Sequence, residues 1–133
     1  MKPLAAAFLM FIGSIVPTFA VEPVTLTSAQ ADTWLGATPE VQVLDVRTKE
    51  EFATGHLTKA TLIPWTDKDF SDRAAKELDP HKPLLVYCQG GVRSAKAAAA
   101  LAKLGFTHVR DLAGGILAWQ QAGKPIEKPA PKK

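Results

Sequence analysis

The 133-residue sequence contains a single cysteine, Cys88, and therefore cannot form an internal disulfide. A dithiol oxidoreductase mechanism within one chain is excluded as well, because no second cysteine is present to resolve a mixed disulfide. The three histidines, His56, His81 and His108, are scattered, and nothing has the spacing of a zinc site. No dinucleotide-binding or P-loop motif is present. The sequence therefore predicts neither a bound metal nor another cofactor.

The chain also has little excess charge of either sign. Its 16 Lys and Arg against 13 Asp and Glu give a formal net charge of +3, too small to argue for a nucleic-acid partner. Much of the excess lies in residues 124–133, where lysines alternate with prolines. We expect this basic, proline-rich stretch to be a disordered tail, with contact to anionic lipid or a partner as the alternative. With 47% hydrophobic residues and no repeats, the rest suits one compact domain over residues 21–123.

The N-terminus has the layout of a secretory signal peptide. Lys2 precedes an apolar run over residues 4–16, and Thr18 and Ala20 place small residues before a cleavage site after Ala20. An uncleaved anchor is the alternative, but the run is short for a span of roughly 20 residues. We therefore expect residues 1–20 to be removed and the mature protein to be exported without a stable membrane span, to the periplasm if the source is bacterial. In such an oxidising compartment an unpaired thiol is expected to be reactive or paired with another molecule.

Apolar, β-branched runs alternate with helical segments along the chain, which predicts an α/β fold with a mainly parallel sheet and helices on both faces. In such folds, ligands bind outside the carboxyl ends of the strands, and Cys88 directly follows a predicted strand. Expected strands are 23–26, 41–44, 61–63, 84–87 and 107–110; expected helices are 28–36, 48–54, one that includes 74–78, 95–104, and one from 114 to about 122.

The segment 88–94, Cys-Gln-Gly-Gly-Val-Arg-Ser, is a tight turn between a buried strand and a helix. Gly90 and Gly91 permit positive φ and allow the backbone N–H groups to turn inward, and Ser94 is a good N-cap. These N–H groups, the helix dipole and Arg93 all favour an anion at the cysteine sulfur. An inert buried thiol is the alternative for an isolated cysteine. The combination instead predicts an anion cradle around a thiolate nucleophile.

This turn resembles the active-site loop of the rhodanese-like sulfurtransferase family, which has the form Cys-x-x-Gly-x-Arg-Ser/Thr. Residues 45–64 are similar to the family's upstream motif, and residues 114–119 to its Gly-Gly-Ile-x-x-Trp run. The resemblance implies a three-layer rhodanese-like fold for the domain over 21–123. It also implies transfer of a sulfane sulfur through a cysteine persulfide. The matching positions are Cys88, Gly91, Arg93 and Ser94 in the loop, and Asp45, Arg47, Glu51, Phe52, Gly55, His56, Leu57, Ala60, Ile63 and Pro64 upstream.

The predicted site combines a nucleophile with a loop that binds anions. Arg93 either orients an anionic donor or braces the loop, and Ser94 either caps the helix or also hydrogen-bonds to sulfur. Glu51 is expected to be a capping carboxylate. The implied partners are a small anionic sulfur donor such as thiosulfate and a thiophilic acceptor, which can be a protein. The predicted site residues are Cys88 as nucleophile, Gln89, Gly90, Gly91, Val92, Arg93 and Ser94 in the loop, and Asp45 and Arg47 as supporting residues.

Two other functions use the same residues. A noncatalytic carrier or interaction module would hold a persulfide on Cys88 for a dedicated partner. A cysteine phosphatase or arsenate reductase is the other alternative. It is disfavoured because only four residues separate Cys88 from Arg93, whereas the related phosphatase signature has five. The loop also contains no aspartate that could protonate a leaving group.

Overall fold

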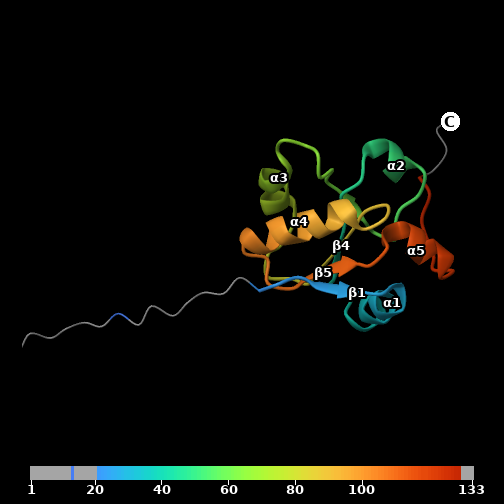
Figure 1. The fold of residues 1–133 in the computed structure, drawn as a ribbon, viewed down its shortest axis with the longest axis horizontal. Coiled ribbons are helices and arrows are strands. Elements are labelled where there is room, and N and C mark those ends of the chain that lie inside the picture. Colours follow the sequence, from blue (N-terminus) through green and yellow to red (C-terminus); the bar gives the residue numbers. More distant parts are fainter. Residues whose placement is uncertain (1–12, 14–20, 130–133) are drawn as a thin grey trace, which may run out of the picture.

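The computed structural model describes residue 13 and residues 21–129 (Figure 1). Apart from Gly13, the predicted signal segment lies outside the described residues, as does the end of the predicted tail. Across the described part of the chain, no helix combines the length and the apolar character that a membrane crossing requires.

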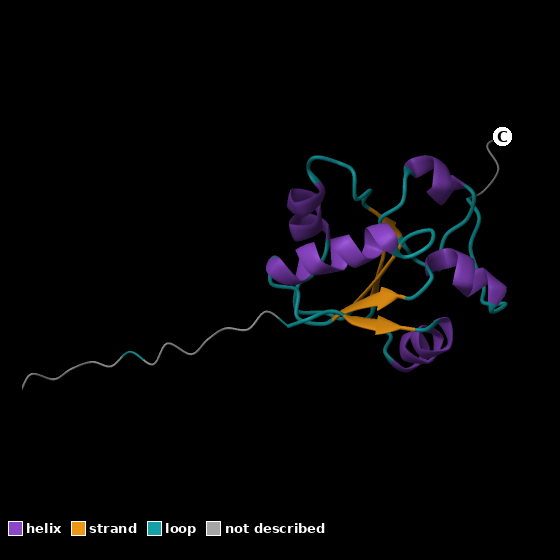
Figure 2. Cartoon of the chain, viewed as in Figure 1, coloured by secondary structure: helices purple, strands orange, loops and turns teal. Residues whose placement is uncertain are grey.

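The described chain forms a five-stranded sheet with the strand order β1-β5-β4-β2-β3, and every strand pair is parallel. The strands and helices alternate along the sequence, and helices lie on both sides of the sheet (Figure 2). The predicted α/β fold is therefore confirmed. The strands are β1 (Val24–Leu26), β2 (Gln42–Asp45), β3 (Thr61–Leu62), β4 (Leu84–Tyr87) and β5 (Val109–Leu112); the helices are α1 (Ser28–Ala37), α2 (Lys49–Ala53), α3 (Phe70–Glu77), α4 (Val92–Lys103) and α5 (Gly115–Gln121).

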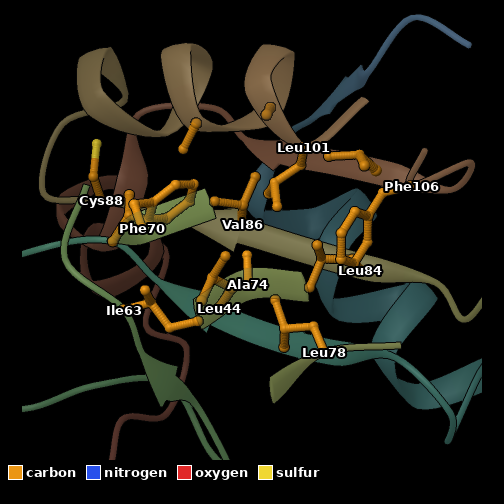
Figure 3. Packing of buried hydrophobic residues seen from close by; sticks show 14 residues of the cluster. Leu44, Ile63, Phe70, Ala74, Leu78, Leu84, Val86, Cys88, Leu101 and Phe106 are labelled. Carbon is orange, nitrogen blue, oxygen red and sulfur yellow. The ribbon is translucent and has the colours of Figure 1, made fainter. Parts of the chain in front are cut away.

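The central strand β4 divides the core into two halves, because successive side chains of a strand point to opposite faces. Leu84, Val86 and Cys88 belong to the cluster that includes buried residues of α3 and α4. Leu85 and Tyr87 belong to the cluster that includes buried residues of α1 and α5. All four residues of β4 are fully buried, as expected of a central parallel strand. Figure 3 shows Cys88 at the end of the row that Leu84 and Val86 begin, beneath the first turn of α4.

The helix after the cysteine turn begins earlier than the sequence predicts. Gly91, with φ of 113°, occupies the N-cap position, and α4 starts at Val92. Ser94 is therefore not the N-cap but lies in the first helical turn, so its predicted capping role is wrong. Gly91 ends the turn in a left-handed conformation that disfavours other residues, and the helix can start directly after it. The Ser94 hydroxyl is thereby free to act within the turn. Among the strands, β5 is shifted two residues toward the C-terminus of the predicted 107–110.

The predicted disorder of the C-terminal segment is wrong for residues 124–128. His56 and Glu127 exchange two backbone hydrogen bonds of 2.8 and 2.7 Å as an isolated antiparallel bridge. Ile126 packs against the cluster that includes Trp119. An apolar residue between two proline-lysine pairs thus supplies enough buried contact to order the segment. Two polar contacts add to it, from Lys124 Nζ to Asp32 Oδ2 at 2.8 Å and from the Trp119 indole N–H to the Pro125 carbonyl oxygen at 2.8 Å.

Candidate active site

Cys88 lies one residue beyond the carboxyl end of β4, with its side chain almost fully buried at 1% exposure. The backbone N–H of Gly91 donates to the Cys88 sulfur at 3.0 Å. The Cys88 thiol donates to Ser94 Oγ at 3.4 Å, and the Ser94 hydroxyl donates to the Gly91 carbonyl oxygen at 3.2 Å. The sulfur thus lies inside the turn at the N-terminus of α4, where an N–H donor and the helix dipole favour negative charge.

The start of α5 holds the outer side of this turn. The backbone N–H groups of Ile116 and Leu117 donate to the carbonyl oxygens of Cys88 and Gln89, at 2.9 and 3.2 Å. Gly115 has φ of +60°, and a Cβ atom placed there would collide with both carbonyl oxygens. Only a residue without a side chain allows α5 to approach the turn this closely.

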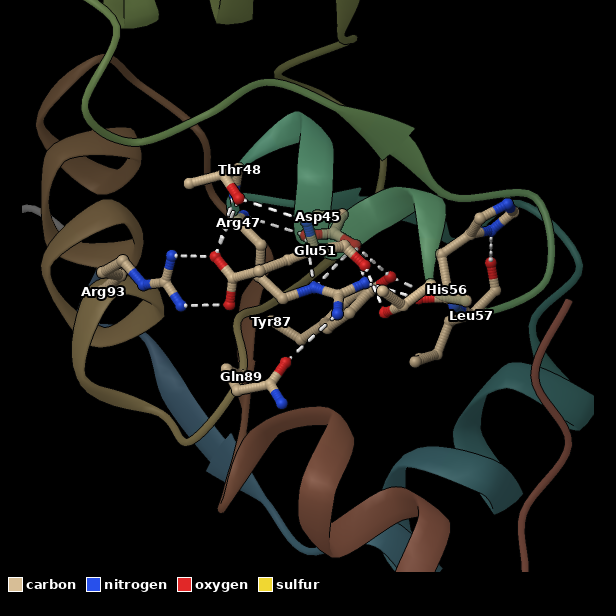
Figure 4. Close-up of polar contacts among 11 residues, drawn as sticks. Asp45, Arg47, Thr48, Glu51, His56, Leu57, Tyr87, Gln89 and Arg93 are labelled. Carbon is tan, nitrogen blue, oxygen red and sulfur yellow. Dashed lines mark hydrogen bonds and ion pairs between the residues drawn. The ribbon is translucent and has the colours of Figure 1, made fainter. Parts of the chain in front are cut away.

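Arg93 is bound to Glu51 rather than directed at the sulfur. Its two terminal nitrogens donate to the two Glu51 carboxylate oxygens at 2.6 and 2.8 Å (Figure 4). Glu51 also caps α2, because its carboxylate accepts the Thr48 backbone N–H at 3.2 Å, which completes a capping box as the sequence predicts. The hydrogen bond from Arg93 is the main cause that lowers the pKa of Glu51 to about 2. Of the two roles left open for Arg93, the geometry supports bracing of the loop.

A second, buried network supports the turn from the neighbouring strand. The Arg47 guanidinium donates to Asp45 Oδ2 at 2.7 Å and, through its other terminal nitrogen, to Gln89 Oε1 at 3.2 Å. The Tyr87 hydroxyl donates to Asp45 at 2.6 Å. Burial, followed by the charge of Asp45, raises the pKa of Tyr87 well above its ordinary value. Arg47 also donates to the Gly55 carbonyl oxygen at 2.7 Å. Through its contacts with Gln89 and Gly55, Arg47 connects the turn to the loop after α2.

The comparisons with known proteins agree with this geometry. Residues 27–122 match the model of the rhodanese-like domain. The chain belongs to this family. A relative, thiosulfate sulfurtransferase 18 of Arabidopsis thaliana, is 37% identical over 120 residues, which cover 82% of this chain and 87% of the relative. The predicted family is therefore confirmed, and the similarity supports sulfurtransferase activity in general.

Solved rhodanese-like domains have the same fold. The solution structure of the rhodanese-like domain of Alr3790 from Anabaena sp. is similar with a TM-score of 0.71 at 30% identity, over 85% of this chain and 89% of that one. The crystal structure of a rhodanese-like domain protein from Staphylococcus aureus has a TM-score of 0.68 at 30% identity, over 80% and 99% of the two chains.

The structure separates the predicted site residues of this rhodanese-like domain into three groups. Cys88, Gly91 and Ser94 contact one another at the sulfur. The remaining predicted residues lie around this centre. Gln89, Arg93, Asp45 and Arg47 form the two supporting networks, whereas Gly90 is exposed and Val92, 71% exposed, lies at the outer rim.

Some residues of the site were not predicted from the sequence. The sequence predicts Tyr87 only as a strand residue, although a tyrosine hydroxyl at the end of a buried strand requires a hydrogen-bond partner. It predicts Gly115 only as part of a helix start, and nothing in the sequence alone reveals what α5 approaches. Among the described residues, no three His, Cys, Asp or Glu side chains cluster as metal ligands would.

Proposed function

We propose that this chain transfers a sulfane sulfur from a small anionic donor such as thiosulfate to a thiophilic acceptor through a persulfide on Cys88. The observation that carries the proposal is the 3.0 Å hydrogen bond from the Gly91 N–H to the Cys88 sulfur, in a turn that matches the family's active-site loop. A hydrogen-bond donor directed at the cysteine sulfur stabilises negative charge in the turn, and both the thiolate and the persulfide are anions.

The reaction has two steps. In the first, the Cys88 thiolate attacks the outer sulfur of thiosulfate, the donor's S–S bond breaks, and sulfite leaves with the electron pair of that bond. In the second, a thiophilic nucleophile such as cyanide attacks the outer sulfur of the persulfide, and the thiolate of Cys88 is released. Gly91 and Ser94 contact the Cys88 sulfur, which carries the charge before the first step and again after the second. In the persulfide between the two steps, the charge lies on the outer sulfur.

The state of Arg93 argues against the phosphatase alternative. A phosphoryl dianion is bound best by a guanidinium that offers two parallel hydrogen bonds. In this structure both terminal nitrogens of Arg93 are already bound to Glu51. Together with the short spacing between Cys88 and Arg93, this leaves the loop suited to a single sulfur atom. We expect no Cys88-dependent hydrolysis of an aryl phosphate by a protein batch that accepts sulfur from thiosulfate.

Mass spectrometry of the purified protein before and after thiosulfate tests the proposal. We expect a gain equal to one sulfur atom that is reversed by cyanide and absent in Cys88→Ser. Circular dichroism of the variant should match the wild type, because the substitution changes little volume. Sustained production of thiocyanate supports the enzyme, whereas loading without turnover supports a carrier. A folded Cys88→Ser variant that still accepts sulfur rules out Cys88 as the nucleophile.

We further propose that the protein acts after export, and in the periplasm if its source is bacterial. The support is the signal-like pattern of residues 1–20. N-terminal sequencing of the exported protein should find Val21 as the first residue. Recovery of exported, folded protein that still begins at Met1 contradicts cleavage.

A further inference from the structure

Two exposed apolar side chains flank the cysteine turn and have no role in the reaction described above. Val92, the first residue of α4, is 71% exposed, and Leu117, in the first turn of α5, is 46% exposed. The two helix starts meet at the turn, where the Leu117 backbone N–H donates to the Gln89 carbonyl oxygen at 3.2 Å (Figure 1). A single exposed apolar side chain requires no explanation. Here two of them, from different helices, lie on either side of the turn that holds the nucleophile.

The exposed charges of α4 and α5 are of one sign. Of the 13 Asp and Glu residues of the chain, only Asp111 and Glu127 follow Asp79 in the sequence. Asp111 is buried, with 7% of the residue exposed, and neither α4 nor α5 contains an Asp or Glu. Lys96 is exposed and lies four residues after Val92, on the same side of α4. The apolar side chains beside the turn are therefore accompanied by positive charge without an exposed carboxylate on either helix.

The neighbouring helix α2 does not reverse this balance. Its Glu51 carboxylate is paired with Arg93 through two hydrogen bonds, and its exposed residues Lys49 and Glu50 carry opposite charges. Lys96 forms no ion pair with any residue that the structure describes. The ammonium group of Lys96 is therefore available to a partner that approaches the turn.

We propose that Gly90, Val92, Lys96 and Leu117 form an acceptor face, which docks a protein whose exposed cysteine is flanked by apolar and acidic side chains. This inference rests on the proposed function, because it names the acceptor of the second step. The thiolate of the partner attacks the outer sulfur of the persulfide. The bond between the two persulfide sulfurs breaks, its electron pair stays on the Cys88 sulfur, and the partner leaves as a persulfide. The step consumes no oxidant or reductant.

The geometry and the charge of the acceptor face favour a protein with this composition. Only a ligand wide enough to touch α4 and α5 together can use both apolar side chains. The reaction also brings an anionic thiolate to an anionic persulfide, and positive charge at the face offsets this repulsion and attracts acidic side chains of the partner. A second copy of this chain fits less well, because a two-fold interface would bring Lys96 of both copies together.

The test follows the second step with cysteine peptides as acceptors. The full chain is loaded with thiosulfate, freed of the donor and mixed with one of two end-blocked peptides, Asp-Leu-Cys-Leu-Asp or Lys-Leu-Cys-Leu-Lys. Mass spectrometry gives the rate of sulfur loss, which is divided by the rate of the same peptide with neutral dithiodipyridine to correct for thiol reactivity. We expect corrected transfer to the acidic peptide to be about threefold faster at low salt, and this advantage to shrink at high salt. Equal corrected rates overturn the proposal.

Two variants with matched controls test the side chains. Lys96→Gln should remove most of the advantage of the acidic peptide, whereas Lys103→Gln, exposed at the far end of α4, should keep it. Leu117→Asn retains the backbone N–H and should slow transfer to both peptides about threefold, but not transfer to cyanide, which is too small to touch both helices. Leu104→Asn, 42% exposed at the far end of α4, should behave as the wild type. An equal loss with cyanide and with the peptides overturns the docking role of Leu117.

The remaining outcomes concern other occupants and the proposed function. A dimer that Leu117→Asn abolishes, or binding to phosphatidylglycerol vesicles that Leu117→Asn abolishes, would assign the face to a second copy or to a membrane and overturn the proposal. Failure of thiosulfate to load sulfur rejects the proposed function alone. Docking is then measured with Cys88 capped as a pyridyl disulfide, from which each peptide thiol releases thiopyridone. Equal corrected rates in that measurement overturn the acceptor face as well.

Discussion

Glu51 and Arg93, 42 residues apart in the sequence, join α2 to the cysteine turn through two parallel hydrogen bonds. The same carboxylate caps α2 through Thr48. One side chain therefore stabilises a helix terminus and fixes the first turn of α4. The position of the turn relative to α2 depends on this contact, and both partners are only partly exposed, at 28% each.

The Glu51 contact should make part of the protein's stability depend on pH in the acid range. The pKa of Glu51 is lowered from 4.5 to about 2 in the folded chain. A depressed folded pKa contributes stability that is complete above about 4.5 and is lost as the pH falls toward about 2. We expect this contribution to be about 2–3 kcal/mol at neutral pH. Urea unfolding at a series of pH values should show the difference between wild type and Glu51→Gln shrinking across that window, and a constant difference contradicts the assignment.

Glu51→Gln also distinguishes the two roles considered for Arg93. If Arg93 braces the loop, breaking the contact from either side should slow sulfur loading to a similar extent. If Arg93 instead bound the donor, Glu51→Gln would release the guanidinium and leave loading by thiosulfate unchanged or faster. Comparison of Glu51→Gln with Arg93→Ala, by the rate of mass gain from thiosulfate, decides between them. We expect similar losses in both variants.

Gly115→Ala should disrupt the turn while leaving most of the fold intact. The added methyl group meets the carbonyl oxygens of Cys88 and Gln89, and φ of +60° is unfavourable for alanine. We expect a loss of about 1–3 kcal/mol in the free energy of unfolding and slower sulfur loading. Gly36→Ala is the matched control, because Gly36 is helical and a Cβ there contacts nothing. Equal behaviour of the two variants would show that the close approach of α5 is unimportant.

Ile126→Ala should loosen the C-terminal segment without affecting the cysteine turn directly. The side chain packs against the cluster that includes Trp119 of α5, and its Cδ1 atom lies 2.9 Å from where a Cβ atom on Gly55 would be. Because Ile126 is half-buried, we expect a loss of about 1–2 kcal/mol, below the usual range for a fully buried isoleucine. Chemical denaturation measures it, and hydrogen exchange of the His56 amide, bonded to Glu127, should become faster. Unchanged exchange would show that Ile126 does not hold this bridge.

The sequence predicts those features that depend on local chemistry. The Thr48–Glu51 capping box and the apolar run of β4 are recognisable because each is determined by residues close in the sequence. The features it missed depend on contacts between distant segments. The order of residues 124–128 arises from packing against Trp119 and His56, and the start of α4 at Val92 depends on the left-handed conformation of Gly91. The sequence correctly indicates that Ser94 lies near the cysteine, but it assigns the N-cap of α4 to Ser94, whereas Gly91 occupies that position.

The hydrogen bonds from α5 also determine the electrical polarity of the cysteine turn. In a trans peptide, the N–H of one residue points away from the carbonyl of the residue before it. With the carbonyl oxygens of Cys88 and Gln89 held by α5, the amides of Gln89 and Gly90 must point away from that helix. A flip of either peptide plane would turn a carbonyl oxygen inward and reverse the local preference from anion to cation. Gly115 lets α5 approach closely enough to hold these carbonyl oxygens, and it therefore maintains the preference of the turn for an anion.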